Sequence, residues 1–384
     1  MMEITEGSHA VAEAVRLCRP QVISAYPITP QTHIVERLAE FVANCELDAE
    51  YITVDNELSA LSACVGASAA GSRTYSATTS QGLALMCEVC FNASGMRLPI
   101  VMSIANRAMG APLSIWNDQQ DSIAMRDAGW LQFYAEDNQE ATDLHFLAYK
   151  VAEDREIQLP AFVCFDGFIL SHTYEPVDML SQEDVDKYLP AYNPAEKLDA
   201  KDPISFGMYA TPDYYLEFRY EMDQAQKRAK GVIAKYGKEF GTLFGRDYSG
   251  LLEAYHLDDA ETAIIAMGSI CGTIKDAIDE MRAAGKKVGL LRIRVFRPFP
   301  SDEIAKALAN VKRVAVLDKN ISLGAKGATA LEIRDALYGS TIPVKGYVLG
   351  LGGRDIRKKD IKEIVSLAEK GIGDQFYGLR KELI

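Results

Sequence analysis

Apolar and polar positions alternate along the first 175 residues in a way that predicts repeated β-strand and α-helix units. Apolar side chains recur every three or four positions over residues 7–17 and 32–44, which is typical of amphipathic helices. Short apolar runs bounded by polar turns favour buried strands over residues 22–25, 51–54, 74–77 and 98–104. This alternation predicts a mostly parallel sheet with helices on both faces.

A second series of the same kind begins near residue 261. Strands are expected over residues 262–267, 288–293, 314–317 and 344–348, so the C-terminal part forms a smaller α/β unit. Between the two series lies a polar, proline-containing stretch, which we expect to wrap as an irregular excursion with a charged helix near residues 214–236. We therefore predict one domain over residues 1–252, with the excursion at about 175–252, and a second domain over 253–384.

Length and charge narrow the class of protein. The 384 residues favour two domains, and the net charge of −13 argues against nucleic acid or an anionic membrane surface as the main partner. No apolar run approaches the roughly 20 residues of a membrane span, and the acidic start of the chain lacks an apolar signal core. The seven cysteines are scattered and odd in number, which predicts reduced thiols. Together these features predict a soluble, cytoplasmic protein.

Two polar side chains follow neighbouring predicted strands. Residues 26–30 read Tyr-Pro-Ile-Thr-Pro, and the two prolines hold Thr29 in a stiff, non-helical turn. Glu57 follows the next strand, where a helix begins. Because loops at the carboxyl ends of parallel strands line the ligand crevice, we expect the hydroxyl and the carboxylate to face one cleft. The alternative for Glu57 is a carboxylate that only complements the helix dipole.

A third candidate, Arg107, follows the strand predicted over residues 98–104. An arginine at the carboxyl end of a strand can hold a carboxylate through two parallel hydrogen bonds, although a surface salt bridge is an equal alternative. The polar stretch 116–121 that comes next is predicted to form either an active-site lid or a capped helix start.

Other motifs favour structural roles. Cys87 and Cys90 form one C-x-x-C pair, which cannot hold a four-iron cluster. The histidines (His9, His33, His145, His172 and His256) show no metal-ligand spacing along the chain, so no protein-held metal site is expected. The glycine-rich turns at 268–272 and 350–353 do not match a dinucleotide fingerprint, and we expect them to cap helices or contact another subunit.

Taken together, these motifs closely resemble the α subunit of pyruvate:ferredoxin oxidoreductase, in the four-subunit form of the thiamine diphosphate-dependent 2-oxoacid:ferredoxin oxidoreductase family. The similar segments follow one another in order and cover almost the whole chain: residues 25–32, 56–57, 79–82, 106–108, 115–121, 168–176, 296–300 and 350–355. The combination is specific, although no single segment would be.

The resemblance implies a thiamine diphosphate-binding, pyrimidine-type α/β domain followed by a domain like the C-terminal one of transketolase. It also implies oxidative decarboxylation of pyruvate to acetyl-CoA and CO2, with coenzyme A as acyl acceptor and ferredoxin as electron acceptor. By position, Glu57 matches the glutamate that hydrogen-bonds the aminopyrimidine ring and so favours the imino tautomer that deprotonates the thiazolium.

The same resemblance assigns further residues. Thr29, Arg107 and Asn117 are expected to contact the 2-oxoacid, with the arginine facing its carboxylate. The cofactor is expected to lie against Glu57 and against the loops that contain Pro27, Ile28, Thr79 and Gln81.

This chain lacks the other half of such a site. Thiamine enzymes hold magnesium with a G-D-G motif and a later asparagine, and the chain has neither this motif nor a cysteine set for iron–sulfur clusters. We therefore expect a β subunit to supply Mg2+, the diphosphate contacts and a [4Fe-4S] cluster, with γ and δ subunits completing the electron path. The alternatives are the same chemistry on a branched-chain, aryl or 2-oxoglutarate substrate, or a non-catalytic scaffold subunit.

Overall fold

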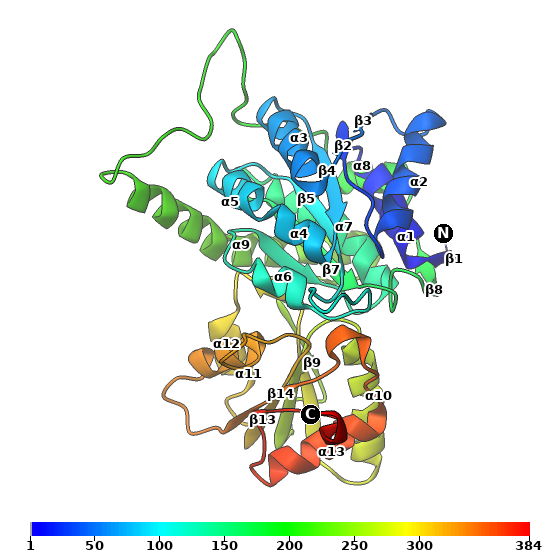
Figure 1. Ribbon diagram of the computed structural model, residues 1–384, viewed down its shortest axis with the longest axis vertical. Helices are drawn as coiled ribbons and strands as arrows, with labels where there is room; N and C mark the ends of the chain where they lie inside the picture. Colours follow the sequence, from blue (N-terminus) through cyan, green and yellow to red (C-terminus); the bar gives the residue numbers. More distant parts are fainter. Residues whose placement is uncertain (1) are drawn as a thin grey trace.

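The computed structural model describes residues 2–384 as two stacked bodies (Figure 1). The larger body is built on a seven-stranded sheet in the order β12-β6-β7-β5-β4-β2-β3. Six strands are parallel, and only the edge strand β12 runs antiparallel to its neighbour β6. The strands are β2 (Val22–Ser24), β3 (Glu50–Ile52), β4 (Thr74–Thr78), β5 (Val101–Asn106), β6 (Leu131–Tyr134), β7 (Ala161–Asp166) and β12 (Val295–Arg297).

Helices cover both faces of this sheet, as its buried strands require (Figure 1). One face is covered by α1 (Gly7–Leu17), α2 (Thr32–Ala43) and α7 (Asn138–Ala152). The other is covered by α3 (Glu57–Ala69), α4 (Ser80–Leu85), α5 (Cys87–Gly95) and α6 (Gln120–Ala124). In α2 the buried side chains Ile34, Val35, Leu38 and Phe41 repeat at helical spacing, so the sequence pattern directly produces the packed face.

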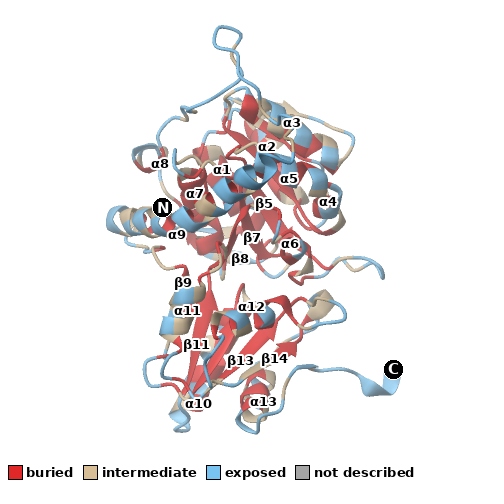
Figure 2. Ribbon diagram, turned by 90° about the vertical axis from the view of Figure 1, so that its left-hand side faces the viewer, coloured by how far each residue is buried: buried red, intermediate tan, exposed pale blue. Residues whose placement is uncertain are grey.

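The excursion leaves the larger body after β7. Its first segment, β8 (Tyr174–Asp178), pairs antiparallel with β1 (Met2–Glu6), and α8 (Gln182–Tyr188) follows. An irregular loop then projects away from the body and returns as the long helix α9 (Tyr215–Phe244) (Figure 1). The loop is largely exposed, whereas α9 packs against α7 through buried positions such as Ile233 and Phe240 (Figure 2).

The smaller body contains a six-stranded sheet in the order β15-β14-β13-β10-β11-β9, parallel except for β9. Helix α10 (Ile270–Ala283) and helix α13 (Lys358–Glu369) cover one face, and α11 (Ser301–Ala307) and α12 (Ala328–Ala336) cover the other. The strands are β9 (Leu252–Tyr255), β10 (Thr262–Ala266), β11 (Val288–Ile293), β13 (Arg313–Asp318), β14 (Val344–Val348) and β15 (Gln375–Phe376). Two short 3-10 helices, η1 (Leu351–Gly353) and η2 (Lys381–Leu383), complete the described elements.

The two bodies share a core and an ionic network. One continuous apolar cluster includes α3 and α5 of the larger body and strands of the smaller one, and buried strands are seen in both (Figure 2). Arg294 donates from Nε to Glu140 Oε1 at 2.6 Å, and Arg292 donates from Nη2 to Glu140 Oε2. The two arginines and Glu140 are buried, so breaking this contact would leave charged groups without partners.

The fold confirms the predicted α/β class with two mostly parallel sheets. Helix 7–17 and strands 288–293 and 344–348 match their predicted bounds. The single helix expected after residue 82 is two helices, α4 and α5, which meet at Met86. The predicted domain boundary falls at the start of β9. However, β12 follows that boundary in the chain and still pairs with β6 in the sheet of the larger body. Among residues 2–384 no helix has the length and apolar character that crossing a membrane requires.

Candidate functional site

The carboxyl edge of the seven-stranded sheet brings the predicted site residues together. Thr29 follows β2, Glu57 follows β3, Gln81 follows β4 and Arg107 follows β5. These four strands are consecutive in the sheet, in the order β5-β4-β2-β3, so their loops lie along one rim.

Glu57 is held at this rim by the start of α3. The side chain of Asn56 caps the helix by accepting a hydrogen bond from Ser59 N at 2.9 Å, which places Glu57 in the first turn. Its side chain is 8% exposed, yet it forms no hydrogen bond or ion pair with any of residues 2–384. A Cβ on Gly82 would lie 2.7 Å from Glu57 Oε1, so only glycine fits beside the carboxylate. A carboxylate so shielded and unpartnered is suited to receive a donor from a ligand.

The turn that contains Thr29 is pinned by a buried side chain that sequence reasoning did not single out. Gln31 donates from Nε2 to the carbonyl oxygen of Tyr26 at 2.7 Å and to that of Ala77 at 3.3 Å, which fixes the turn against β4. Pro27 and Thr29 are exposed, and the Thr29 hydroxyl has no hydrogen-bond partner among residues 2–384. The hydroxyl is therefore available to a ligand.

Arg107 is buried, so the alternative of a surface salt bridge does not describe it. Its Nη1 donates to the Thr29 carbonyl oxygen at 2.8 Å, and its Nε donates to the Ser114 carbonyl oxygen at 3.0 Å. Neither Nη2 nor any other guanidinium nitrogen pairs with a carboxylate within residues 2–384. Burial lowers the pKa of Arg107, and the charge of Asp121 opposes that shift. A buried guanidinium that pairs with no carboxylate among residues 2–384 is suited to receive an anionic ligand.

Asp121 organises the rim from beneath. Its Oδ2 accepts hydrogen bonds from Ser80 N and Arg107 N, each at 3.0 Å, and its Oδ1 accepts one from Asn106 Nδ2 at 2.7 Å. Burial raises the pKa of Asp121, and these donors oppose the rise. The carboxylate thus ties the loop after β4 to the loop after β5. The only signal in the sequence was an acidic residue at an expected helix start.

Three other predicted residues lie at this edge with polar groups already engaged. Thr79 donates from Oγ1 to the Ala105 carbonyl oxygen at 2.6 Å, and Gln81 Oε1 accepts from the Ser80 hydroxyl. Asn117 is buried, donates from Nδ2 to the Asn106 carbonyl oxygen at 3.2 Å and accepts from Lys319 Nζ at Oδ1. These contacts shape the site, and direct ligand contacts by these three side chains stay predictions.

Residues of the smaller body hydrogen-bond to the loop that follows Arg107 and hold it in place. Lys319 Nζ donates to Asp166 Oδ2 at 3.0 Å as well as to Asn117, and both charged side chains are buried. Gly352 N donates to Asp118 Oδ2 at 3.0 Å, so the glycine-rich turn at 350–353 holds this loop. Burial raises the pKa of Asp118 to about 6, although the Gly352 N–H lowers it in part.

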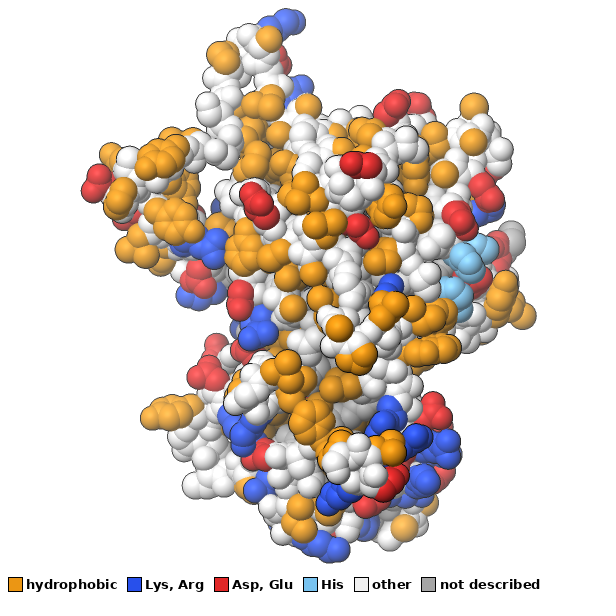
Figure 3. Space-filling model, in the orientation of Figure 1, with side chains coloured by type: hydrophobic (Ala, Val, Ile, Leu, Met, Phe, Trp, Pro, Cys, Tyr) orange, Lys and Arg blue, Asp and Glu red, His pale blue; other side chains and the backbone are white. Residues whose placement is uncertain are grey.

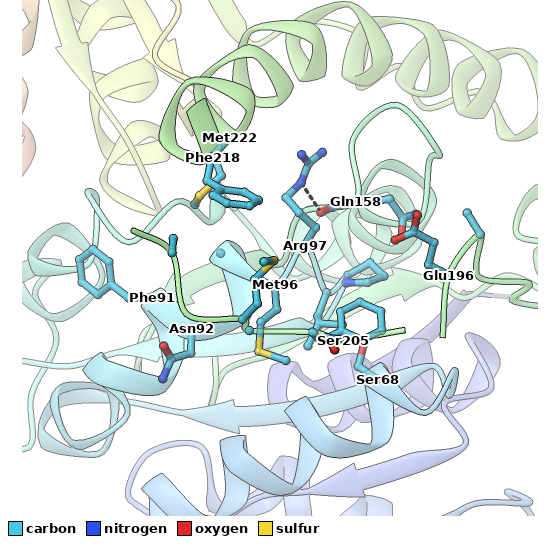
Figure 4. A pocket seen from close by; sticks show the side chains of 18 of the residues that line it. Ser68, Phe91, Asn92, Met96, Arg97, Gln158, Glu196, Ser205, Phe218 and Met222 are labelled. Carbon is cyan, nitrogen blue, oxygen red and sulfur yellow. Dashed lines mark hydrogen bonds between the residues drawn. The ribbon is translucent and has the colours of Figure 1, made fainter. Parts of the chain in front are cut away.

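A separate cavity of about 610 Å3 lies under the excursion (Figure 4). Phe91, Met96, Phe218 and Met222 line it, and Arg97 donates there to the Gln158 carbonyl oxygen at 3.1 Å. Its walls include the segments just before β5 and β7, so it opens at the amino edge of the sheet. It is therefore distinct from the rim that holds Glu57.

Two solved structures share the fold of this chain over most of its length. The chain matches a 2-oxoglutarate:ferredoxin oxidoreductase from Magnetococcus marinus with a TM-score of 0.72 and 21% identity, over 95% of this chain and 65% of that one. It matches a split-gene transketolase with a TM-score of 0.56 and 12% identity, over 96% and 99% of the two chains. At these identities the likeness concerns the fold alone.

Sequence comparison is more specific. Residues 13–238 match the family described as pyruvate flavodoxin/ferredoxin oxidoreductase, thiamine diphosphate-binding, and residues 260–361 match pyruvate:ferredoxin oxidoreductase core domain II. The chain therefore belongs to the pyruvate flavodoxin/ferredoxin oxidoreductase family, as the sequence motifs indicated.

Curated relatives extend over nearly the whole chain. Pyruvate synthase subunit PorA of Methanosarcina barkeri is 53% identical, over 100% of this chain and 98% of the relative. The PorA subunit of Methanothermobacter thermautotrophicus is 54% identical, over 96% of each chain. The ketoisovalerate oxidoreductase subunit VorA of Pyrococcus horikoshii is 49% identical, over 96% of this chain and 94% of the relative.

Proposed function

We propose that this chain is the α-type subunit of a pyruvate:ferredoxin oxidoreductase and provides the aminopyrimidine side of its active site. The complex oxidatively decarboxylates pyruvate to acetyl-CoA and CO2 and passes the electrons to ferredoxin. The relatives named pyruvate synthase subunit support this reaction. The observation that carries the proposal is the shielded, unpartnered carboxylate of Glu57 beside Gly82.

The rim fits the pyrimidine end of thiamine diphosphate. When bound, this cofactor supplies the nucleophilic carbon and electron sink that decarboxylation of a 2-oxoacid needs. Glu57 would accept a hydrogen bond from a protonated ring nitrogen, because nothing among residues 2–384 competes for the carboxylate. The Pro27–Ile28 turn and the Thr79–Gln81 loop would flank the ring on neighbouring strands.

The 2-oxoacid is assigned to Arg107 and Thr29. The free Nη2 of Arg107 would hold the substrate carboxylate, because its other donors are anchored on Thr29 and Ser114 and fix the direction of the guanidinium. The unpartnered Thr29 hydroxyl would contact an oxygen of the same substrate. Both groups lie on stiff loops, which favours a defined orientation of the reacting carbon.

A partner subunit is assigned to the open side of the rim. Large apolar side chains are exposed around it, namely Leu58, Leu85, Leu113 and Trp116, and hydrophobic side chains spread over the face of α3, α4 and α5 (Figure 3). Such a surface is typical of a protein–protein contact. We assign Mg2+, the diphosphate contacts and a [4Fe-4S] cluster to a β subunit seated here, and the remaining electron path to γ and δ subunits.

The test is Glu57→Gln in the complex reconstituted with its partner chains. Glutamine keeps the volume beside Gly82 but removes the carboxylate charge, so pyruvate-dependent reduction of an artificial acceptor should fall by about 100-fold or more. Glu36→Gln, an exposed change on α2, is the matched control. Unchanged turnover by a folded Glu57→Gln complex would refute the assigned role.

Ketoisovalerate is the second candidate substrate, because a VorA relative is 49% identical over nearly its full length. The wild-type complex should be assayed with pyruvate, a branched-chain, an aryl and a five-carbon dicarboxylic 2-oxoacid. The highest kcat/KM for pyruvate supports the first assignment. A preference for the branched-chain acid would change the assigned substrate from pyruvate to ketoisovalerate, and the roles assigned to Glu57 and Arg107 would stay the same.

A further inference from the structure

We propose that Glu6, His9 and His33 form a site for a divalent transition-metal ion, with Zn2+ as its best-suited occupant. Glu6 ends β1 and precedes α1, His9 lies in the first turn of α1, and His33 is the second residue of α2. The site lies on the helix face of the larger body near the N-terminus, and none of its residues takes part in the function proposed above.

The three side chains converge although they come from separate elements. One ligand atom from each lies within 4.8 Å of the other two, and Glu6 Oε1 is 2.6 Å from His33 Nδ1. Ligand atoms around a tetrahedral zinc ion stand about 3.3 Å apart, given metal–ligand bonds of about 2.0–2.1 Å. The Glu6–His33 contact is shorter than that spacing, so an ion that binds here must separate these two groups and draw in His9, and neither imidazole is buried against such a movement.

The carboxylate at the centre of the group is fixed in place. Glu6 is 6% exposed, and within residues 2–384 its carboxylate has no partner other than His33. The backbone just after it is anchored, because Gly7 N donates to the Thr173 carbonyl oxygen at 3.1 Å and Ser8 N to that of Ser171 at 2.9 Å. The buried carboxylate is therefore a fixed ligand toward which the two more exposed imidazoles can turn.

A third imidazole, that of His172, packs against the ring of His33. The ring of His172 lies 4.7 Å from that of His33, and its Nδ1 is hydrogen-bonded to Ser171 Oγ at 2.7 Å. His33 is thus held between Glu6 and His172, which restricts its ring. Figure 3 shows the histidine side chains of this face as a single patch at the surface. Solvent can therefore reach the site and occupy a fourth coordination position.

The donor set decides the class of metal. Two imidazoles and one carboxylate, with an open fourth position, suit Zn2+ and related ions such as Co2+ and Ni2+. Mg2+ and Ca2+ prefer sites made wholly of oxygen ligands, so they should not compete. A bound ion would join the start of α1 to the start of α2, the helix that follows the Thr29 turn. Binding to the folded chain alone would raise its unfolding temperature.

The experiment titrates the full chain with ZnCl2 by calorimetry, in a Cys45→Ser background because that thiol is exposed and can also bind zinc. We expect one strong zinc site per chain, and MgCl2 should give no binding. Because even outer-shell changes weaken metal sites by about 10–100-fold, His9→Ala and His33→Ala should each lower zinc affinity at least tenfold. His256→Asn is the matched control, since it removes an exposed imidazole elsewhere at a φ of 50° that asparagine tolerates.

Two results would overturn the proposal. One is a wild-type chain that binds no zinc, which would leave Glu6 and His33 as a simple hydrogen-bonded pair. The other is His9→Ala binding zinc as tightly as its parent, which would place the metal elsewhere. Unfolding temperatures without metal show whether each variant is folded, and only the parent and His256→Asn should gain stability when zinc is added.

Discussion

Arg107 donates a hydrogen bond from Nη1 to the backbone carbonyl oxygen of Thr29, 2.8 Å away, although 78 positions separate the two residues. The bond spans the ends of β5 and β2, which are not adjacent because β4 lies between them. The Arg107 guanidinium, which we assign to the substrate carboxylate, is therefore oriented by the loop that contains Thr29. A substitution at either position should change how the other residue is placed.

Arg107→Lys tests this coupling. Lysine keeps the charge but cannot serve two carbonyl oxygens and a carboxylate with one planar group. In the reconstituted complex we expect kcat/KM for pyruvate to fall by an amount equivalent to about 2–4 kcal/mol. Arg155→Lys, at an exposed position, is the control. A value within a few-fold of wild type would mean that the arginine is only structural.

Gly82→Ala tests the fit beside Glu57. The added Cβ would lie 2.5 Å from Thr78 Oγ1 and 2.7 Å from Glu57 Oε1, so one of them must move. We expect a loss of stability of about 1–3 kcal/mol in urea unfolding, together with loss of turnover. Gly95→Ala is the matched control, because a Cβ there meets no atom within 4 Å. Equal effects of the two changes would count against a tight cradle around the carboxylate.

Lys319→Met tests the attachment of the Arg107 loop to the smaller body. Burial favours the neutral form of Asp166, but the Lys319 ammonium and hydrogen bonds outweigh it, so the pKa of Asp166 is lowered. Removing the lysine leaves that carboxylate buried without a counter-ion, which should cost about 3–5 kcal/mol of stability. The double variant Lys319→Met/Asp166→Asn should recover part of the loss. Additive losses in the double variant would argue that the two residues act independently.

The raised pKa of Asp118 predicts how the free energy of unfolding depends on pH. Burial raises its pKa from 3.8 to about 6, so the folded chain holds this proton more tightly than the unfolded chain does. The contribution of Asp118 to the free energy of unfolding should therefore fall as the pH rises from about 4 to about 6, by up to about 3 kcal/mol. Urea unfolding of the wild type and of Asp118→Asn across this range measures it. A constant difference between the two proteins would disprove the raised pKa.

The sequence predicted the rim better than the contacts beneath it. Parallel strands deliver the residues that follow them to one edge, so the shared location of Thr29 and Glu57 was predicted from the apolar runs, and the structure adds Arg107 to the same edge. The contacts of Asp121 with the loops after β4 and β5 could not be predicted, because they depend on the angles at which the two loops leave their strands. The roles of Thr29, Glu57 and Arg107 in binding stay predictions.

Contacts between distant segments were the main omission. The pairing of β1 with β8 joins residues that lie far apart in the chain, and neither strand has a strong periodic pattern. For the same reason the histidine spacing along the chain concealed the meeting of Glu6, His9 and His33, which come from three elements. The rim residues were found because strand ends share one edge of a sheet, whereas no such rule brings Glu6, His9 and His33 together.

The position of the edge strand β12 in the sequence constrains the order in which this polypeptide can fold. The large sheet starts at residue 22, but its last strand is not synthesised until residue 297. A nascent fragment ending near residue 252 would present the unpaired edge of β6 and would leave Glu140 without the arginines that neutralise it. We therefore expect the two bodies to fold together, and a fragment ending near residue 252 to aggregate when it is expressed alone.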